Sequence, residues 1–175
     1  EAAHPTAVLS AVHDKPWRIL HLAAHGVFEF DAGGKEPVSG LVLDNGIFFT
    51  AAEADQLRYV PELAFINCCH LGQTRADASP LVPFHKLAAN LATQFIKMGA
   101  RAVVAAGWAV DDAAAKTFAG AFYRLMLDGE LYGDAIRQAR RDTYFAHGET
   151  NTWGAYQCYG DPSFSLKARP SQSDE

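Results

Sequence analysis

The side chains best suited to covalent chemistry in this sequence are a histidine and a cysteine, each directly after an apolar run. Residues 17–24 run into His25, and residues 63–68 run into Cys69. Both runs are short and have almost no charge in their interior, which is typical of central strands covered by helices. Because ligands gather at the carboxyl ends of strands in open α/β sheets, neighbouring strands would bring an imidazole and a thiol together. A nearby histidine raises the thiolate fraction of a cysteine or takes its proton during attack.

Other histidines lie close to this pair in the sequence. His21 lies four residues before His25 on the same face of its strand, in mid-strand, where packing is the expected role. His21, His25, Cys69 and His70 are all acceptable zinc ligands. However, a strand would separate the rings of His21 and His25 by roughly 13 Å at about 3.3 Å per residue, which is too far for one ion. The sequence therefore disfavours a metal site.

The elements that would position these residues alternate between strands and helices. Asn45 and Gly46 between two apolar triplets predict a hairpin, and Thr50 with Glu53 predicts a capped helix running to about Arg58. Further helices are predicted over residues 84–98, from Asp111 or Asp112 to about 129, and from 133; further strands over 102–108, 155–159 and 164–166; and loops over 27–39 and 73–83. This alternation points to a three-layer α/β/α sandwich with a mostly parallel sheet.

Length and composition fit one soluble domain. The chain has 175 residues, of which 49% are hydrophobic, enough for a substantial core. We assign residues 1–168 to the domain and 169–175 to a disordered tail. The formal net charge of −5 disfavours nucleic-acid and anionic-membrane binding, and no apolar segment approaches a bilayer span. The adjacent cysteines argue against a disulfide framework, so we expect a reducing, cytoplasmic location. Because the chain does not begin with methionine, we expect that it derives from a longer polypeptide.

Several segments together resemble the CHAT proteases, which are caspase-like cysteine peptidases distantly related to separases. The segments are residues 19–26 (ILHLAAHG), 65–72 (FINCCHLG), 99–112 (GARAVVAAGWAVDD) and 153–162 (WGAYQCYGDP). Each segment alone is a weak signal, but their order along most of the chain is fairly specific. By comparison with the family, we expect the opening strand of the caspase-like sheet to be missing from this chain.

The resemblance implies a role for each candidate residue. The family places its nucleophile at Cys69, which leaves Cys68 to point into a helix layer, and His25 becomes the general base. The backbone N–H groups of Gly26 and Cys69 are the predicted oxyanion donors, because neither would be needed in a ladder once its strand has ended. His70 replaces an acidic or polar residue common in the family, and either tuning of the thiolate or an ordinary loop position fits it.

A further set of residues is expected at the substrate. Asp111 and Asp112 follow the strand expected beside the cysteine strand, where separases carry an acidic residue that recognises arginine before the cleaved bond. Helix capping is the alternative role for either aspartate. Trp108 would form an apolar wall of that pocket or belong to the core.

The resemblance also implies a biological setting. The substrate would be a partner protein, no cofactor would be needed, and a sensor or repeat module in the same polypeptide or operon would switch on the activity. Bacterial defence or programmed cell death is the setting that the family implies. The main alternative is a non-catalytic caspase-like interaction module. A small-molecule-binding α/β domain is disfavoured because the sequence has neither a GxGxxG motif nor a P-loop.

Overall fold

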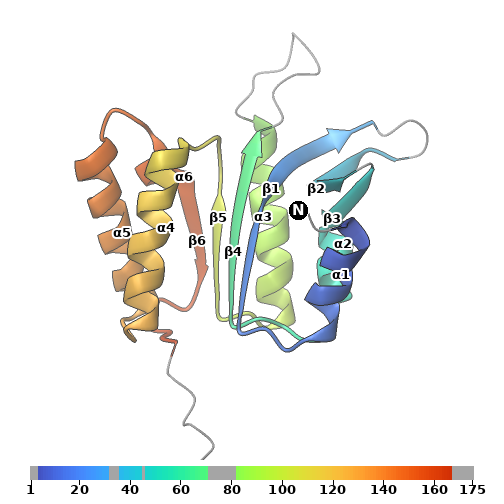
Figure 1. The fold of residues 1–175 in the computed structure, drawn as a ribbon, viewed down its shortest axis with the longest axis horizontal. Coiled ribbons are helices and arrows are strands. Elements are labelled where there is room, and N and C mark those ends of the chain that lie inside the picture. The colour runs from blue at the N-terminus through green and yellow to red at the C-terminus, as the bar shows by residue number, and fades with distance from the viewer. Residues whose placement is uncertain (1–3, 32–35, 45, 71–81, 167–175) are drawn as a thin grey trace, which may run out of the picture. The chain divides into compact units, whose positions relative to one another are not determined.

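The computed structural model describes residues 4–31, 36–44, 46–70 and 82–166, with the backbone alone for residues 69, 70 and 82–84. The chain divides into two compact units. The first consists of Glu1–Val110 and Ala155–Gly160, and the second of Asp111–Gly154 and Asp161–Glu175. The first unit contains the sheet, and the second contains two long helices (Figure 1).

The sheet of the first unit has six strands in the order β3-β2-β1-β4-β5-β6. The strands are β1 (Ile19–Phe30), β2 (Val38–Asp44), β3 (Ile47–Thr50), β4 (Leu63–His70), β5 (Ala102–Ala106) and β6 (Tyr156–Gly160). At the centre, β1, β4 and β5 run parallel side by side (Figure 1), whereas the β1–β2, β2–β3 and β5–β6 pairings are antiparallel. The predicted α/β class, with parallel strands at its centre, is confirmed, and the sheet is mixed.

One face of this sheet carries the hydrophobic core of the first unit. The helices of the unit are α1 (Pro5–Asp14), α2 (Ala51–Asp55) and α3 (Val82–Met98). Leu22 of β1, Ile66 of β4 and Phe95 of α3 belong to one buried cluster, to which α1 and α2 also contribute. Along β1, Leu20 and Leu22 are buried whereas the alternate residues are not, because successive strand side chains point to opposite faces.

The register of the two central strands is fixed at their amino ends. Arg18, directly before β1, donates from Nε to one oxygen of Glu62 at 2.5 Å and from an Nη nitrogen to the other at 3.2 Å. Glu62 directly precedes β4, and the backbone N–H of Leu63 donates to the carbonyl of Arg18 at 3.1 Å. A two-point Arg–carboxylate contact is geometrically specific, although at a partly exposed site it contributes only modestly to stability. From there the two strands pair without a break, from Ile19 with Leu63 to Gly26 with His70.

The short-range predictions around the hairpin are confirmed. β2 and β3 pair antiparallel up to Asp44 and Ile47, and Gly46 has a φ of +81°, which glycine adopts without strain. Thr50 and Glu53 form the predicted capping box at the start of α2, although the helix ends at Asp55, before the predicted Arg58. Asn45 lies outside the described residues.

The predicted loop over residues 27–39 is wrong at both ends. β1 continues through Phe30, and β2 begins at Val38, because the two strands pair antiparallel from His25 with Val42 to Phe30 with Val38. The polar, Gly- and Pro-bearing signals lie only between these strands, and the apolar residues Val27, Phe28 and Phe30 favour a strand.

Three other boundaries differ from prediction. The segment over residues 164–166 is not a strand, because the carbonyl of Phe164 accepts the backbone N–H of Tyr132 at 2.7 Å instead of joining a ladder. β5 ends at Ala106, two residues before the predicted end of that strand at Trp108. α3 begins at Val82, inside the predicted loop over residues 73–83, whose other residues up to 81 lie outside the described part.

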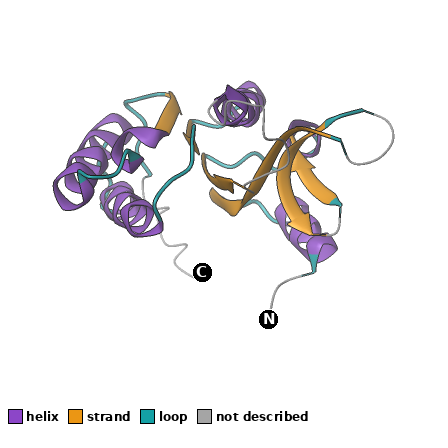
Figure 2. Ribbon diagram, turned by 90° about the horizontal axis from the view of Figure 1, so that it is seen from above, coloured by secondary structure: helices purple, strands orange, loops and turns teal. Residues whose placement is uncertain are grey.

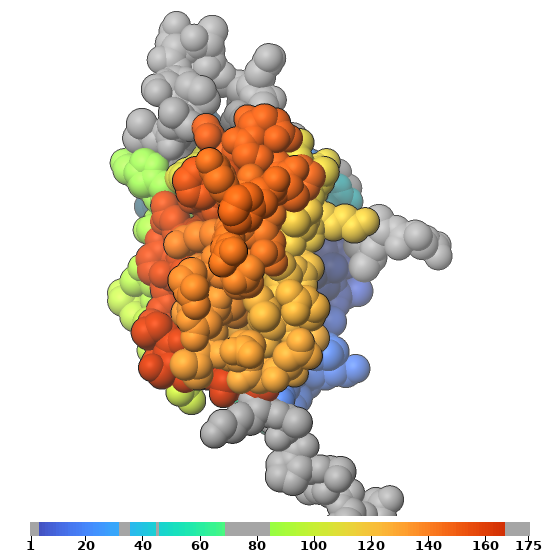
Figure 3. Space-filling model, turned by 90° about the vertical axis from the view of Figure 1, so that its left-hand side faces the viewer, coloured from blue at the N-terminus to red at the C-terminus, as the bar shows by residue number. Residues whose placement is uncertain are grey.

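The second unit is built around a pair of helices. Its helices are α4 (Asp112–Leu127), α5 (Tyr132–His147) and the short α6 (Thr152–Ala155), whose last residue belongs to the first unit. α4 and α5 pack side by side (Figure 2) through buried aromatic side chains, with the rings of Phe122 and Tyr132 in edge contact at 6.1 Å. The yellow and orange atoms of α4 and α5 make up much of the surface of this unit that Figure 3 shows. Among the described residues, no helix combines the length and the apolar character needed to cross a membrane.

Candidate functional site

The structure brings the backbone positions of His25 and Cys69 together. β1 and β4 are parallel neighbours, and His25 is the register partner of Cys69, one pair before Gly26 and His70. Adjacent strands lie about 4.8 Å apart, so two residues in register are within reach of a side-chain hydrogen bond. The imidazole of His25 is exposed, whereas the side chain of Cys69 lies outside the described residues. The carboxyl end of β4 is therefore the candidate site.

Cys68 occupies the core, as predicted. Its side chain is 1% exposed and belongs to the apolar cluster that α3 covers. Its Sγ atom lies 3.9 Å from the carbonyl oxygen of Ala106 on β5. A thiol in this position has no access to solvent, so it packs as a small apolar group. This leaves Cys69 as the cysteine at the register position of His25.

Gly26 lies within a continuous ladder. Its register partners are His70 on β4 and Leu41 on β2, so the premise that β1 ends at this glycine is wrong. The reason is the β2 strand, which was not expected to pair here. The oxyanion role of the Gly26 N–H stays a prediction.

A β-bulge follows the site on β1. The β1–β2 register shifts between Val27 and Phe30, and Glu29 has a φ of +50°, in the left-handed region that residues other than glycine rarely adopt. The backbone N–H of Glu29 donates to Ser39 Oγ on β2 at 2.9 Å. Bulges are frequent beside active sites, because they bend a strand and redirect its side chains. Sequence reasoning missed this feature, since it treated the segment as a loop.

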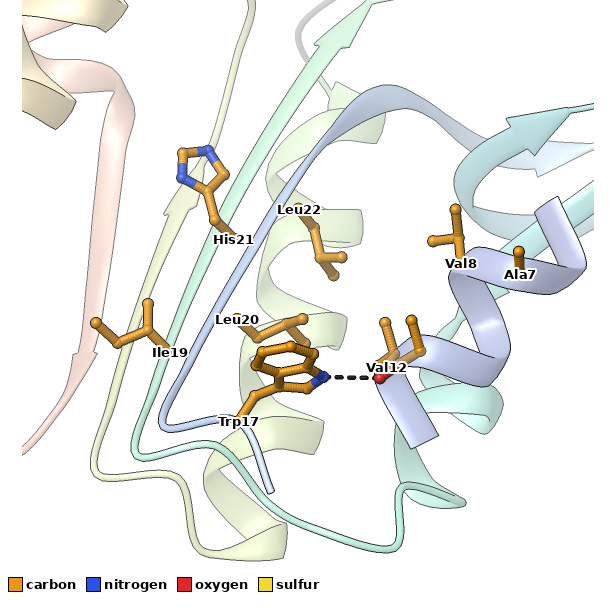
Figure 4. Close-up of a pocket in the computed structure, with 9 residues that line it drawn as sticks. Ala7, Val8, Val12, Trp17, Ile19, Leu20, His21 and Leu22 are labelled. Carbon is orange, nitrogen blue, oxygen red and sulfur yellow. Dashed lines mark hydrogen bonds between the residues drawn. The ribbon is translucent and has the colours of Figure 1, made fainter. Parts of the chain in front are cut away.

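His21 packs on the opposite side of β1 from Leu20 and Leu22 (Figure 4). Its ring stacks on Phe65, its register partner on β4, with the centroids 4.9 Å apart. The contact removes part of the ring from water, and this desolvation lowers the pKa of His21 below its usual 6.5. A neutral ring stacked on an aromatic neighbour supports the predicted packing role.

The shifted pKa of His21 predicts a pH-dependent stability. The unfolded chain takes up a proton on this histidine near pH 6.5, whereas the folded ring resists protonation until lower pH. The contribution of His21 is therefore complete above pH 6.5 and is lost as the pH falls through the pKa of the folded ring. We measure the urea concentration at which half of the protein is unfolded, at pH 7.5 and at pH 5.5. This midpoint should fall less in His21→Gln than in the wild type. Equal losses in the two proteins would contradict the assignment.

An apolar groove lies beside the amino end of β1. It has a volume of about 310 Å³ and is lined by residues of α1 and β1, including Val8, Val12 and Leu22 (Figure 4). The indole N–H of Trp17 donates to the carbonyl of Ala11 at 2.7 Å and ties the end of α1 to the start of the strand. His21 lines this groove, but His25 does not. The groove is therefore separate from the candidate site.

The predicted specificity residues belong to different units. Trp108 is half-buried in the first unit, whereas Asp111 and Asp112 begin the second. Asp111 is the N-cap of α4: its carboxylate accepts the N–H of Ala114 at 2.9 Å, and its own N–H donates to Thr152 Oγ1 at 2.9 Å. Asp112 is the first residue of the helix and is exposed. That these aspartates serve the substrate stays a prediction.

Asn67 is a polar residue at the site that sequence reasoning did not single out. It lies two residues before Cys69 on β4 and pairs in register with Ala23. Its Oδ1 atom is buried and has no hydrogen-bond partner among the described residues. The signal in the sequence was an amide side chain inside an otherwise apolar strand. Such a residue calls for an explanation, since a buried polar group without a partner is costly.

Metal binding was the alternative use of the same residues. Within residues 4–31, 36–44, 46–70 and 82–166, no three His, Cys, Asp or Glu side chains gather in a way that could hold an ion. The rings of His21 and His25 occupy strand positions four residues apart. Strand geometry separates these two positions by about 13 Å, which is too far for both rings to bind one ion.

Comparison with known families assigns the chain to one family. The sequence model of the CHAT domain matches residues 1–161. The chain belongs to the CHAT domain family. This family is related to the caspase-like cysteine peptidases, so the paired His25 and Cys69 of this CHAT domain lie in a peptidase-related fold. A comparison with curated proteins gives no match.

Proposed function

We propose that this CHAT domain is a cysteine endopeptidase that cleaves a peptide bond in a partner protein. The observation that carries the proposal is the register of His25 with Cys69 at the carboxyl end of a parallel strand pair. Parallel pairing places residues in register side by side, and this edge of an α/β sheet is where ligands gather. Cys68 cannot serve as the nucleophile, because it is buried in the core.

The proposed reaction begins with transfer of the Cys69 proton to His25. The thiolate sulfur attacks the carbonyl carbon of the substrate, and the carbon–oxygen double bond opens to an oxyanion. When the tetrahedral intermediate collapses, the carbon–nitrogen bond breaks and His25 returns the proton to the departing amine. Water, deprotonated by His25, then attacks the thioester carbon. The carbon–sulfur bond breaks, the carboxylic acid leaves, and His25 returns the proton to the Cys69 sulfur.

The oxyanion needs hydrogen-bond donors in fixed positions. We assign this role to the backbone N–H groups of Gly26 and Cys69. The β1–β2 register is regular from His25 to Val27 and shifts only beyond Val27, so the bulge lies outside the pairing of this glycine. Removing one such donor typically costs 10²–10³-fold in rate. No cofactor takes part in these steps.

The test is labelling by a peptidyl thiol-reactive probe. A wild-type protein with the proposed dyad carries the label on Cys69, and His25→Ala loses it. Cys158, which is half-buried on β6, and the buried Cys68 serve as internal controls within the same chain. Labelling of Cys69 that does not depend on His25, or no labelling at all, would favour the non-catalytic interaction module.

We further propose that a basic residue precedes the scissile bond. Asp111 and Asp112 supply the negative charge, and Trp108 an apolar wall. The exposed Asp112 is the better carboxylate for a substrate, because Asp111 already accepts the N–H of Ala114. We expect a peptide library to show a preference for Arg that Asp112→Ala reduces. Preference for Leu or Met, unaltered by Asp112→Ala, would restrict the aspartates to helix capping.

We propose a biological setting together with the activity, on the family resemblance alone. An attached sensor or repeat module would switch on the peptidase, and its target would be one partner protein in the cytoplasm, in bacterial defence or programmed cell death. Cleavage by the chain with and without a co-expressed sensor or repeat module, in the presence and absence of an inducing signal, tests this regulation.

A further inference from the structure

The β-bulge on β1 decides which face of the sheet Phe30 occupies. An odd number of positions separates Phe30 from His25, so regular alternation would place their side chains on opposite faces of β1. Between Val27 and Phe30, however, β1 advances three residues while β2 advances two, from Gly40 to Val38. The extra residue on β1 restores Phe30 to the face that carries His25.

The partners of His25 across the hairpin are apolar. His25 pairs in register with Val42 on β2, and Val42 pairs with Phe48 on β3. Residues in register share a face, so these three side chains form one row across three strands. The ring of Phe30 lies 6.3 Å from that of Phe48 and extends this row. We call Val42, Phe48 and Phe30 the hairpin strip.

The hairpin strip lies on the side of the sheet away from the core of the first unit. Leu41 and Phe49, which neighbour the strip in sequence, are 0% and 1% exposed and belong to the apolar cluster to which α1, α2 and α3 contribute. Because successive strand residues point to opposite faces, Val42 and Phe48 point away from that cluster. Phe30 is 39% exposed, and the other two are half-buried. The strip is therefore an apolar surface in the row of the proposed base.

The proposed reaction determines which part of a substrate would meet this strip. Cys69 lies on β4, His25 on the adjacent β1, and the hairpin follows on the far side of β1. Since His25 returns its proton to the departing amine, the residue that carries this amine lies on the His25 side of Cys69. The next strand in that direction is β2, about 4.8 Å beyond His25, where Val42 begins the hairpin strip.

From this arrangement we infer that the hairpin strip binds a large apolar side chain directly after the scissile bond. The inference rests on the proposed peptidase function. The substrate class is a peptide with leucine, phenylalanine or methionine at this position, whose burial against the strip favours binding. An acidic side chain would lose hydration there without gaining a partner. This preference is independent of the charge proposed for the residue before the bond.

A synthetic peptide library that contains every pair of adjacent residues tests the inference. Mass spectrometry identifies the residues on both sides of each broken bond, so the residue after the bond is read separately from the residue before it. We expect leucine, phenylalanine and methionine to predominate after the bond. Two peptides that differ only in leucine or glutamate at this position should differ at least about tenfold in kcat/KM.

Two variants distinguish recognition from folding. Phe30→Lys places an ammonium group on the strip at an exposed position and should reverse the preference, so that the glutamate peptide is cleaved faster than the leucine peptide. Val42→Thr keeps a β-branched side chain and should lower the rate with the leucine peptide several-fold. Val60→Thr, at an exposed valine outside the sheet, is the matched control and should behave as the wild type.

Iodoacetamide separates failure of the inference from failure of the proposed function. It carries no peptide to recognise, so its His25-dependent reaction with Cys69 reports the dyad alone and should be unchanged in Phe30→Lys and Val42→Thr. With that reaction intact, a wild type without a preference for apolar residues after the bond, or a leucine preference that survives both variants, overturns the inference. Iodoacetamide reactivity that does not depend on His25 overturns the proposed function, and this inference with it.

Discussion

Cys69→Ala abolishes peptide-bond cleavage and leaves the protein folded. The substitution removes the only atom that can form the thioester, so the expected loss is complete within the detection limit of the assay. Cys69 stands at the carboxyl end of β4, at the register position of His25, and the apolar core is formed by the alternate residues of the strand. The measurement is cleavage of a verified substrate by purified wild type and variant, with the thermal midpoint recorded for both.

Cys68→Ala is the matched control for this prediction. It changes the same atoms one residue away, in a side chain that is 1% exposed and packed under α3. Removal of one buried heavy atom typically costs about 1 kcal/mol of stability, so the thermal midpoint should fall while activity is retained. Equal cleavage by the wild type and Cys69→Ala would refute the assignment. Loss of cleavage in Cys68→Ala alone would mean that Cys68, and not Cys69, is the nucleophile.

The short-range features of this fold were predictable because each depends on adjacent residues. Gly46 specifies a tight turn through its positive φ, Thr50 and Glu53 cap a helix reciprocally, and Gly99 ends α3 with a φ of +109°. None of these needs knowledge of what lies elsewhere in the chain. The alternation of such elements was therefore enough to predict an α/β fold.

From the sequence, the strands that carry His25 and Cys69 could be predicted to be neighbours, but their register could not. The register of His25 with Cys69 is set by contacts between residues far apart in the sequence, such as Arg18 and Glu62, which are separated by 44 positions. No local pattern specifies that contact. The same reason explains the error at Gly26, because the ladder that continues β1 depends on β2, whose pairing with β1 was not anticipated.

Asn67 was missed for a related reason. In the sequence it is one polar residue in an apolar run, and hydrophobic patterning treats it as a tolerated exception. Its significance depends on whether its oxygen is satisfied, which only the folded chain can show. The structure answers this directly, since Oδ1 is buried and has no partner among the residues it describes.

His25→Ala lowers the rate of cleavage by about 10²–10⁴-fold, the usual contribution of a general base, and the loss of thiolate activation adds to it. The imidazole is exposed and the residue lies at the end of the β1–β4 ladder, so its removal should leave the fold intact. The measurement is the single-turnover rate with excess enzyme, which reports acyl-enzyme formation without product release.

His21→Ala is the control that distinguishes catalysis from packing. It removes an imidazole from the same strand and the same face, but one that stacks on Phe65 at 4.9 Å. Loss of this contact should lower the thermal midpoint, and the cleavage rate at a temperature where the variant is folded should stay within a few-fold of the wild type. An unchanged thermal midpoint with a lost rate in His21→Ala would mean that the two histidines are assigned the wrong way round. The opposite pattern, with His25→Ala inactive and stable, ties the proposed proton transfer to the histidine in register with Cys69.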